Sequence, residues 1–115
     1  MPLDRDAATL LDLVNAARLV VRFVEGLDYE AFQADAKTQS ATIHQLLVIG
    51  EATKRLSDGF KEKHPSIPWR DMARMRDKMI HHYDAVDVAE VWRASRADVP
   101  ELLAMLKPLV PDRET

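Results

Sequence analysis

The fold class can be derived from residues 4–26, DRDAATLLDLVNAARLVVRFVEG. The apolar residues of this stretch recur at steps of four and three, which places them on one face of an α-helix. They are Leu10, Val14, Ala17, Val21 and Val24. Gly26 follows them, and glycine commonly ends a helix. The stretch predicts an amphipathic helix, from residue 4 to about residue 25, that must bury one face against other helices.

The rest of the chain repeats this helical pattern between stop signals. A short helical turn is expected after Asp28, and a last helix after the capping box of Asp87 and Glu90. Pro100 should kink or split that last helix. The expected helices after the first cover about 29–34, 36–62, 69–82 and 88 onward. We therefore expect an all-α protein, an antiparallel bundle of four to five helices. It should form a single domain over residues 1–115, with its core in about 4–107 and a frayed C-terminal tail.

Gly50 interrupts the expected helix 36–62, where a glycine costs ~1 kcal/mol relative to alanine. Such a glycine usually marks the close approach of another backbone, so a tight helix crossing is expected there. Glu51, next to it, is either a surface acid or a buried, hydrogen-bonded one. Trp69 follows two closely spaced prolines and is expected to anchor that corner of the bundle.

Composition excludes several classes of protein. The chain has 115 residues and no cysteine, so disulfides, thiolate metal sites and cysteine nucleophiles are excluded. Its start is charged, and no stretch approaches the ~20 apolar residues that span a bilayer. We expect a soluble, cytoplasmic protein. The net charge is −3, yet residues 54–78 hold eight basic residues and four acids, a local excess that can attract phosphates.

The most reactive groups gather in residues 76–83, RDKMIHHY. Arginine makes a two-pronged contact with phosphate, and histidine can accept a proton at neutral pH. Arg76 and His81 could together cleave RNA: the histidine would draw the proton from a 2′-hydroxyl, and the arginine would stabilise charge on the adjacent phosphate. Asp77 lies four residues before His81 and, on a helix, could orient its ring. No metal or other cofactor is needed for this chemistry.

The spacing also sets a constraint. Residues five apart on an α-helix point about 140° apart, so Arg76 and His81 cannot hold one small group on an unbroken helix. Either the helix opens near His81 or two copies of the chain pool their residues. Two other readings remain open. His81 and His82 could bind a metal, although neighbouring helical residues diverge, and Arg76, His81 and Tyr83 could simply be ordinary helix-end residues.

At these residues the chain resembles the HEPN superfamily, specifically the HepT-like toxins of HEPN/MNT toxin–antitoxin modules. The superfamily pattern is an arginine, four to six residues and a histidine, with a polar residue after the arginine. Arg76, Asp77 and His81 match it, and His82-Tyr83 matches the x-Tyr that follows the histidine in HepT-like proteins. Further matches are Ile49-Gly50-Glu51-Ala52, Ile67-Pro68-Trp69-Arg70, Val86-Asp87 and Val91-Trp92, and the resemblance covers roughly residues 4–107.

The resemblance implies a helical homodimer and a metal-independent endoribonuclease that acts as a toxin. Arg76 and His81 would be its catalytic pair, with Asp77 and His82 in support. His82 also satisfies the spacing, and His81 is favoured because it completes His-x-Tyr. The implied partner is an MNT-type nucleotidyltransferase antitoxin that transfers AMP from ATP onto Tyr83. The alternative is a non-catalytic helical subunit that only binds such a transferase.

Overall fold

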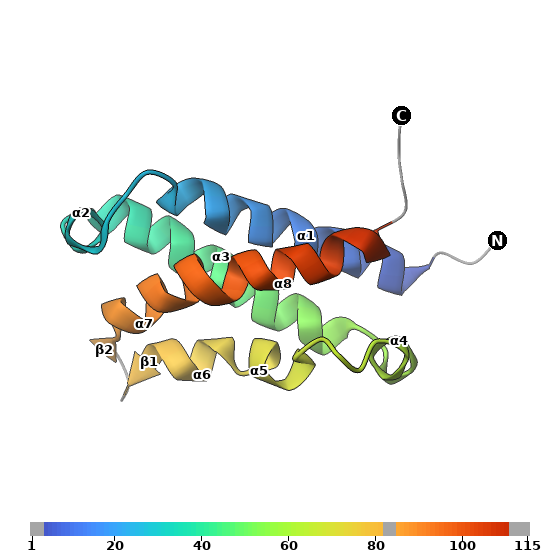
Figure 1. Ribbon diagram of the computed structural model, residues 1–115. Coiled ribbons are helices and arrows are strands. Elements are labelled where there is room, and N and C mark those ends of the chain that lie inside the picture. Colours follow the sequence, from blue (N-terminus) through green and yellow to red (C-terminus); the bar gives the residue numbers. More distant parts are fainter. Residues whose placement is uncertain (1–3, 82–84, 111–115) are drawn as a thin grey trace.

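The computed structural model describes residues 4–81 and 85–110, which form an antiparallel helical bundle (Figure 1). Its two longest helices, α1 (Arg5–Val24) and α3 (Ala36–Arg55), pack along each other. The other elements are, in chain order, α2 (Tyr29–Gln33), α4 (Asp58–Lys63), α5 (Trp69–Ala73), α6 (Met75–Met79), β1 (Ile80–His81), β2 (Ala85–Val86), α7 (Val88–Arg93), the π-helical turn Ala94–Asp98, α8 (Val99–Leu106) and the 3-10 turn Lys107–Leu109. The predicted all-α class is confirmed.

The core is built on the apolar face of α1. Leu10, Val14 and Ala17 are almost completely buried, and so are the neighbouring Leu13 and Val20. They pack against α3 and α8, which contribute further buried aliphatic side chains. Fully burying one such side chain stabilises a fold by about 1.5–3 kcal/mol, so this face accounts for the association of the helices. The helix ends before Gly26, whose φ of 80° is the left-handed conformation that favours glycine.

The second long helix is shorter than its apolar period predicts. It ends at Arg55, and Leu56 is extended with a ψ of 141°. The Ser57 side chain then accepts a hydrogen bond from the Phe60 backbone at 3.1 Å and caps a separate helix, α4. Asp6 of α1 stabilises this corner, because its carboxylate accepts bonds from both the backbone N–H and the hydroxyl of Ser57, at 2.9 and 2.6 Å.

The predicted tight crossing at Gly50 is confirmed. A Cβ at this position would lie 3.4 Å from the backbone oxygen of Met72 and 3.7 Å from that of Ala73, so α5 crosses α3 in backbone contact. Glu51 is exposed, which settles its reading as a surface acid. Trp69 anchors the next corner as expected, since its indole N–H donates to the His64 backbone oxygen at 2.9 Å.

The last helix contains a π-helical turn just before Pro100, and the backbone stays helical through it. Asp87 caps α7 by accepting a hydrogen bond from the Glu90 backbone at 3.0 Å. The helix then widens into the π-helical turn Ala94–Asp98, and Pro100 lies in the first turn of α8. Proline has no N–H to donate, so this placement costs little at a helix start.

Candidate functional site

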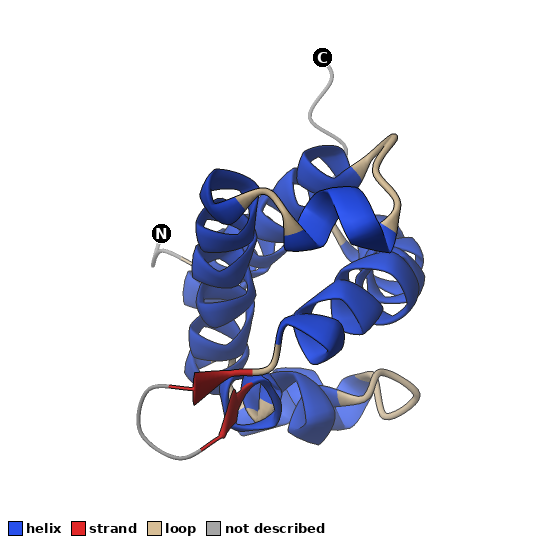
Figure 2. Cartoon of the chain, turned by 90° about the vertical axis from the view of Figure 1, so that its left-hand side faces the viewer, coloured by secondary structure: helices blue, strands red, loops and turns tan. Residues whose placement is uncertain are grey.

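The segment that carries the predicted site is not one helix. Residues 69–82 were expected to form a continuous helix, and that prediction is wrong. The helix breaks at Arg74, with φ −94° and ψ 7°, and ends at Met79. Ile80 is extended, with φ −108° and ψ 119°. It pairs with Val86, and His81 pairs with Ala85, in the small antiparallel hairpin of β1 and β2 (Figure 2).

The helix ends at Met79 because the backbone oxygen of Met79 bonds to a later part of the chain instead of continuing the helix. The Met79 backbone oxygen accepts a bond from the Asp87 N–H at 2.7 Å. The β-branched residues Ile80 and Val86 suit the extended pairing that follows. This contact closes the hairpin and places the start of α7 directly beside the end of α6.

The hairpin removes the constraint on Arg76 and His81. On a continuous helix their side chains would point about 140° apart. Here Arg76 lies on the last turn of α6, and the backbone of His81 lies in β1. Of the two predicted ways to join these residues, the opening of the helix near His81 is therefore present. His82 and Tyr83 lie outside the described residues.

Arg76 is held only weakly by its surroundings. Its side chain is 66% exposed, and its ion pair with Asp77, which is 75% exposed, spans 3.8 Å. That distance exceeds a hydrogen bond, and such surface pairs contribute about 0–1 kcal/mol. Within residues 4–81 and 85–110 no second acidic group pairs with this guanidinium. It can therefore exchange its carboxylate for a phosphate at little cost.

Asp77 was expected to reach His81 through the four-residue helical spacing. That spacing does not exist here, because the helix ends two residues after Asp77. The partner that the structure gives to the Asp77 carboxylate is Arg76. A supporting role for Asp77 stays a prediction, now with the arginine as the group it would orient.

The inner face of α6 fixes the segment to the bundle. Met75 and Met79 are 5% and 0% exposed, and Ile80 packs against the same core. Arg76, Asp77 and Lys78 remain on the exposed side. The charged groups thus stand on a rigid support, which is what a site that positions a phosphate requires.

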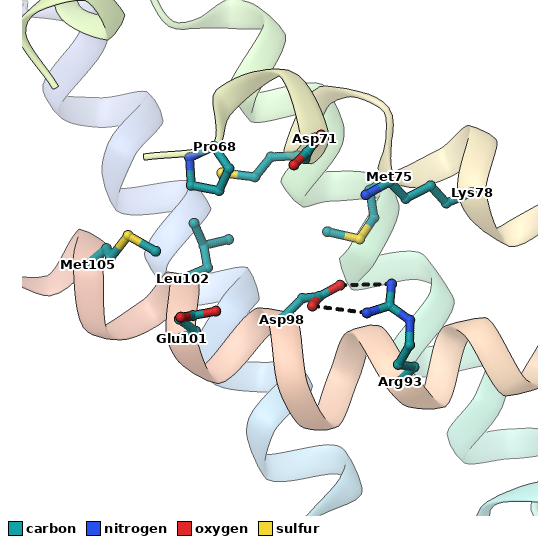
Figure 3. A pocket seen from close by; sticks show the side chains of 10 residues that line it. Pro68, Asp71, Met75, Lys78, Arg93, Asp98, Glu101, Leu102 and Met105 are labelled. Atoms are coloured by element: carbon teal, nitrogen blue, oxygen red, sulfur yellow. Dashed lines mark hydrogen bonds and ion pairs between the residues drawn. The ribbon is translucent and has the colours of Figure 1, made fainter. Parts of the chain in front are cut away.

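A second feature, not predicted from the sequence, is a groove of about 250 Å³ between α5–α6 and α7–α8 (Figure 3). Met75 and Lys78 line it. On α6 the Arg76 side chain points about 100° away from that of Met75 and about 160° away from that of Lys78. The groove therefore opens on a different face from the Arg76 guanidinium.

Arg93 is the charged group that closes one end of this groove. Its guanidinium donates to Asp98 at 3.1 Å and forms two hydrogen bonds with Glu90. The Glu90 bonds, followed by those to Asp98, raise the pKa of Arg93 above its ordinary value. In contrast to Arg76, Arg93 is committed to a structural role: it ties α7 to the π-helical turn. In the sequence, these ion pairs are indicated only by the spacing of the two acids, three residues before and five residues after Arg93.

The described residues form neither a metal site nor a membrane-spanning helix. In the described part of the chain, no group of three or more histidine, aspartate or glutamate side chains is placed to hold a metal ion. Among the helices that residues 4–81 and 85–110 form, none combines the length and the apolar character needed to cross a membrane.

Comparison with known proteins places the chain in a defined group. The sequence profile of the family described as "Ribonuclease HepT-like" matches residues 13–109. A protein of Thermococcus cleftensis named "Probable ribonuclease HepT" is 47% identical over 81% of this chain and 84% of its own length. "Putative RNase MJ0127" of Methanocaldococcus jannaschii is 36% identical over 99% of this chain and 94% of its own. A third relative, "Putative RNase TTE0752" of Caldanaerobacter subterraneus, is 34% identical over 85% and 88%. No solved structure matches the chain.

Proposed function

Because the chain belongs to the HepT-like ribonuclease family of the HEPN superfamily, we propose that it is an endoribonuclease whose site is the segment 76–83. The observation that carries the proposal is the end of α6 at Met79, between the arginine and the histidine of the motif. It frees the two residues from opposite faces of one helix. The exposed, weakly paired Arg76 supplies the phosphate contact.

The proposed reaction needs one base and one cation. His81 removes the proton from a ribose 2′-hydroxyl, whose oxygen attacks the adjacent phosphorus. The bond from phosphorus to the 5′-oxygen breaks, and that oxygen takes up a proton. The products are a 2′,3′-cyclic phosphate and a 5′-hydroxyl end. Arg76 stabilises the charge that builds on the phosphate oxygens, with the adjacent Asp77 as a supporting acid.

The test is cleavage of a labelled single-stranded RNA by the purified chain in EDTA. His81→Ala should lower the rate by about 10²–10⁴-fold, the usual contribution of a general base. The matched control is His44→Ala, which removes an exposed histidine of α3 and should leave the rate unchanged. Products with a 5′-phosphate and a 3′-hydroxyl end would contradict the mechanism.

The same assay decides between the two adjacent histidines. Loss of cleavage in His82→Ala, with an unchanged rate in His81→Ala, would move the base to His82. Unchanged rates in both variants would remove histidine from the mechanism. A chain that cleaves no RNA, is not toxic when expressed alone, and still binds a nucleotidyltransferase would be a non-catalytic subunit.

We further propose that the protein is the toxin of a cytoplasmic toxin–antitoxin pair and is silenced at Tyr83. In the proposed step the tyrosine oxygen attacks the α-phosphorus of ATP, pyrophosphate leaves, and AMP remains on the tyrosine. The added phosphate is negative and bulky, so it would compete with RNA for Arg76. Co-expression with an MNT-type nucleotidyltransferase should raise the intact mass by adenylyl units, and Tyr83→Phe should abolish the rise. A rise that survives this substitution would place the modification elsewhere.

The proposed assembly is a homodimer in which two such segments face one cleft. A mixture of Arg76→Ala and His81→Ala chains tests it. Recovered cleavage in the mixture would show that the two residues act across the interface. If the mixture stays inactive while sedimentation shows dimers, each site is built within one chain.

A further inference from the structure

A cluster of aromatic side chains lies where α2 meets α7. The Trp92 ring lies 5.2 Å from that of Phe32 and 6.1 Å from that of Tyr29, centroid to centroid. Phe32 is completely buried, whereas Tyr29 and Trp92 are only partly buried. Arg96 is exposed, and its guanidinium carbon lies 5.2 Å from the centre of the Trp92 ring. At the outer edge of this cluster, the guanidinium of Arg96 therefore lies over the ring of Trp92.

The cluster includes a side chain of α7, the helix that directly follows the hairpin of the proposed active site. Val88, Trp92 and Arg96 follow one another at steps of four residues and form a row along α7 into the π-helical turn. Each step advances about 6 Å along the helix axis. Val88 begins α7, two residues after the strand that pairs with His81. Figures 1 and 2 place α2, α7 and the hairpin at the same end of the bundle.

Arg96 also borders a small hollow. A concavity of about 140 Å³ lies between the end of α1 and the π-helical turn. Its wall includes the apolar side chains of Val21 and Val24, and Arg96 stands at its edge. The guanidinium thus has an aromatic ring beside it and open space next to it. Arg93, three residues earlier, is instead bound to two carboxylates.

This arrangement matches the chemistry that binds unpaired nucleobases. Single-stranded RNA is held by stacking of its bases on aromatic rings and on the planes of arginine side chains. In a duplex the bases are stacked on one another and are not accessible in this way. We propose that Trp92 and Arg96 form a base-stacking subsite for single-stranded RNA, a few nucleotides from the cleaved phosphate. This inference rests on the proposed ribonuclease function, because it names the form of RNA that the site accepts.

Binding tests the subsite without cleavage, in the full-length His81→Ala chain. The probes are a labelled unpaired oligoadenylate and an RNA duplex of equal length. Arg96→Ala should raise the Kd for the unpaired RNA about tenfold, within the range measured for the loss of one stacked base. Arg96→Lys should not restore the affinity, because lysine keeps the charge but lacks the plane. Neither variant should change the Kd for the duplex.

The matched control is Arg22→Ala, which removes an exposed arginine from the last turn of α1 and lies outside the aromatic cluster. It should leave the Kd for unpaired RNA within twofold. If Arg96→Lys binds unpaired RNA with the native affinity, residue 96 only contacts a phosphate, and the stacking proposal is wrong. An equal loss for duplex and unpaired RNA would overturn it as well.

Tryptophan fluorescence gives a second readout, because the chain has only two tryptophans. In a Trp69→Phe chain all tryptophan emission comes from Trp92, and the oligoadenylate should quench it, whereas inorganic polyphosphate should not. In a Trp92→Phe chain the remaining Trp69 should show no quenching. The two proposals can fail separately. If the native chain cleaves RNA but Trp92 is not quenched, the ribonuclease proposal stands and the stacking subsite is wrong. If Trp92 is quenched but the native chain cleaves no RNA, the stacking subsite stands and the ribonuclease proposal is wrong.

Discussion

Replacing Arg76 by alanine separates a catalytic arginine from a structural one. The Arg76–Asp77 pair spans 3.8 Å between side chains that are 66% and 75% exposed. A surface pair of this kind contributes about 0–1 kcal/mol, so Arg76→Ala should change the free energy of unfolding by less than ~1 kcal/mol. If Arg76 binds the reacting phosphate, the cleavage rate should fall by about 10²–10³-fold, which corresponds to roughly 2.7–4 kcal/mol.

The chain contains a closely matched control for this change. Arg55 of α3 forms an ion pair with Asp12 of α1 at 3.7 Å, and these side chains are 54% and 61% exposed. Because distance and exposure are so similar, Arg55→Ala should cost about the same small amount of stability. Arg55 does not belong to the motif, and its replacement should leave the cleavage rate unchanged.

The assay combines urea unfolding with single-turnover cleavage of RNA by both variants. Equal stability and a selective loss of cleavage in Arg76→Ala are expected. Arg76→Lys should recover only part of the rate, because lysine lacks the two-pronged contact. If Arg76→Ala cleaves RNA as fast as Arg55→Ala, Arg76 is not part of the site. If it loses well over 1 kcal/mol of stability, its role is structural.

Three further changes test the fold. Gly50→Ala should match or exceed the native stability by up to ~1 kcal/mol, whereas Gly50→Val should lose about 1–3 kcal/mol against the Met72 carbonyl, both measured by urea unfolding. Asp6→Asn should be less stable than the native chain at neutral pH. The hydrogen bonds from Ser57 lower the Asp6 pKa below 3.8, so this difference should shrink as the pH falls below 3.8, and a constant difference would contradict it. Arg93→Ala should lower thermal stability by about 1 kcal/mol and leave RNA cleavage intact, and lost cleavage without lost stability would oppose its structural role.

Local patterns predicted the bundle well because they depend on neighbouring residues alone. The apolar steps of residues 4–26 define the buried face of α1, and Asp28 and Asp87 cap the helices that follow them. Gly50 indicated a close helix crossing, because a glycine inside a helix lowers the stability of the helix and usually has a packing reason. The match of Arg76 and His81 to a family motif also required only their spacing.

The breaks in the helices were decided by contacts between distant residues. The apolar period runs through Leu56, yet α3 stops there, and Asp6, 51 residues from Ser57, stabilises the new corner. The end of α6 depends in the same way on the bond from the Asp87 N–H to the Met79 oxygen. Periodicity carries no information about such bonds, because they form only when the chain has folded back on itself.

The candidate site shows this division most clearly. The sequence by itself determined which groups are present: an arginine, a histidine five residues later and an acid beside the arginine. It also determined that one unbroken helix could not bring the first two together, since five residues correspond to about 140° of rotation. Only the tertiary structure decided that the helix ends at Met79, before His81. The pairing of Ile80 with Val86 replaces the next helical turn with a hairpin, and this pairing depends on where α7 packs.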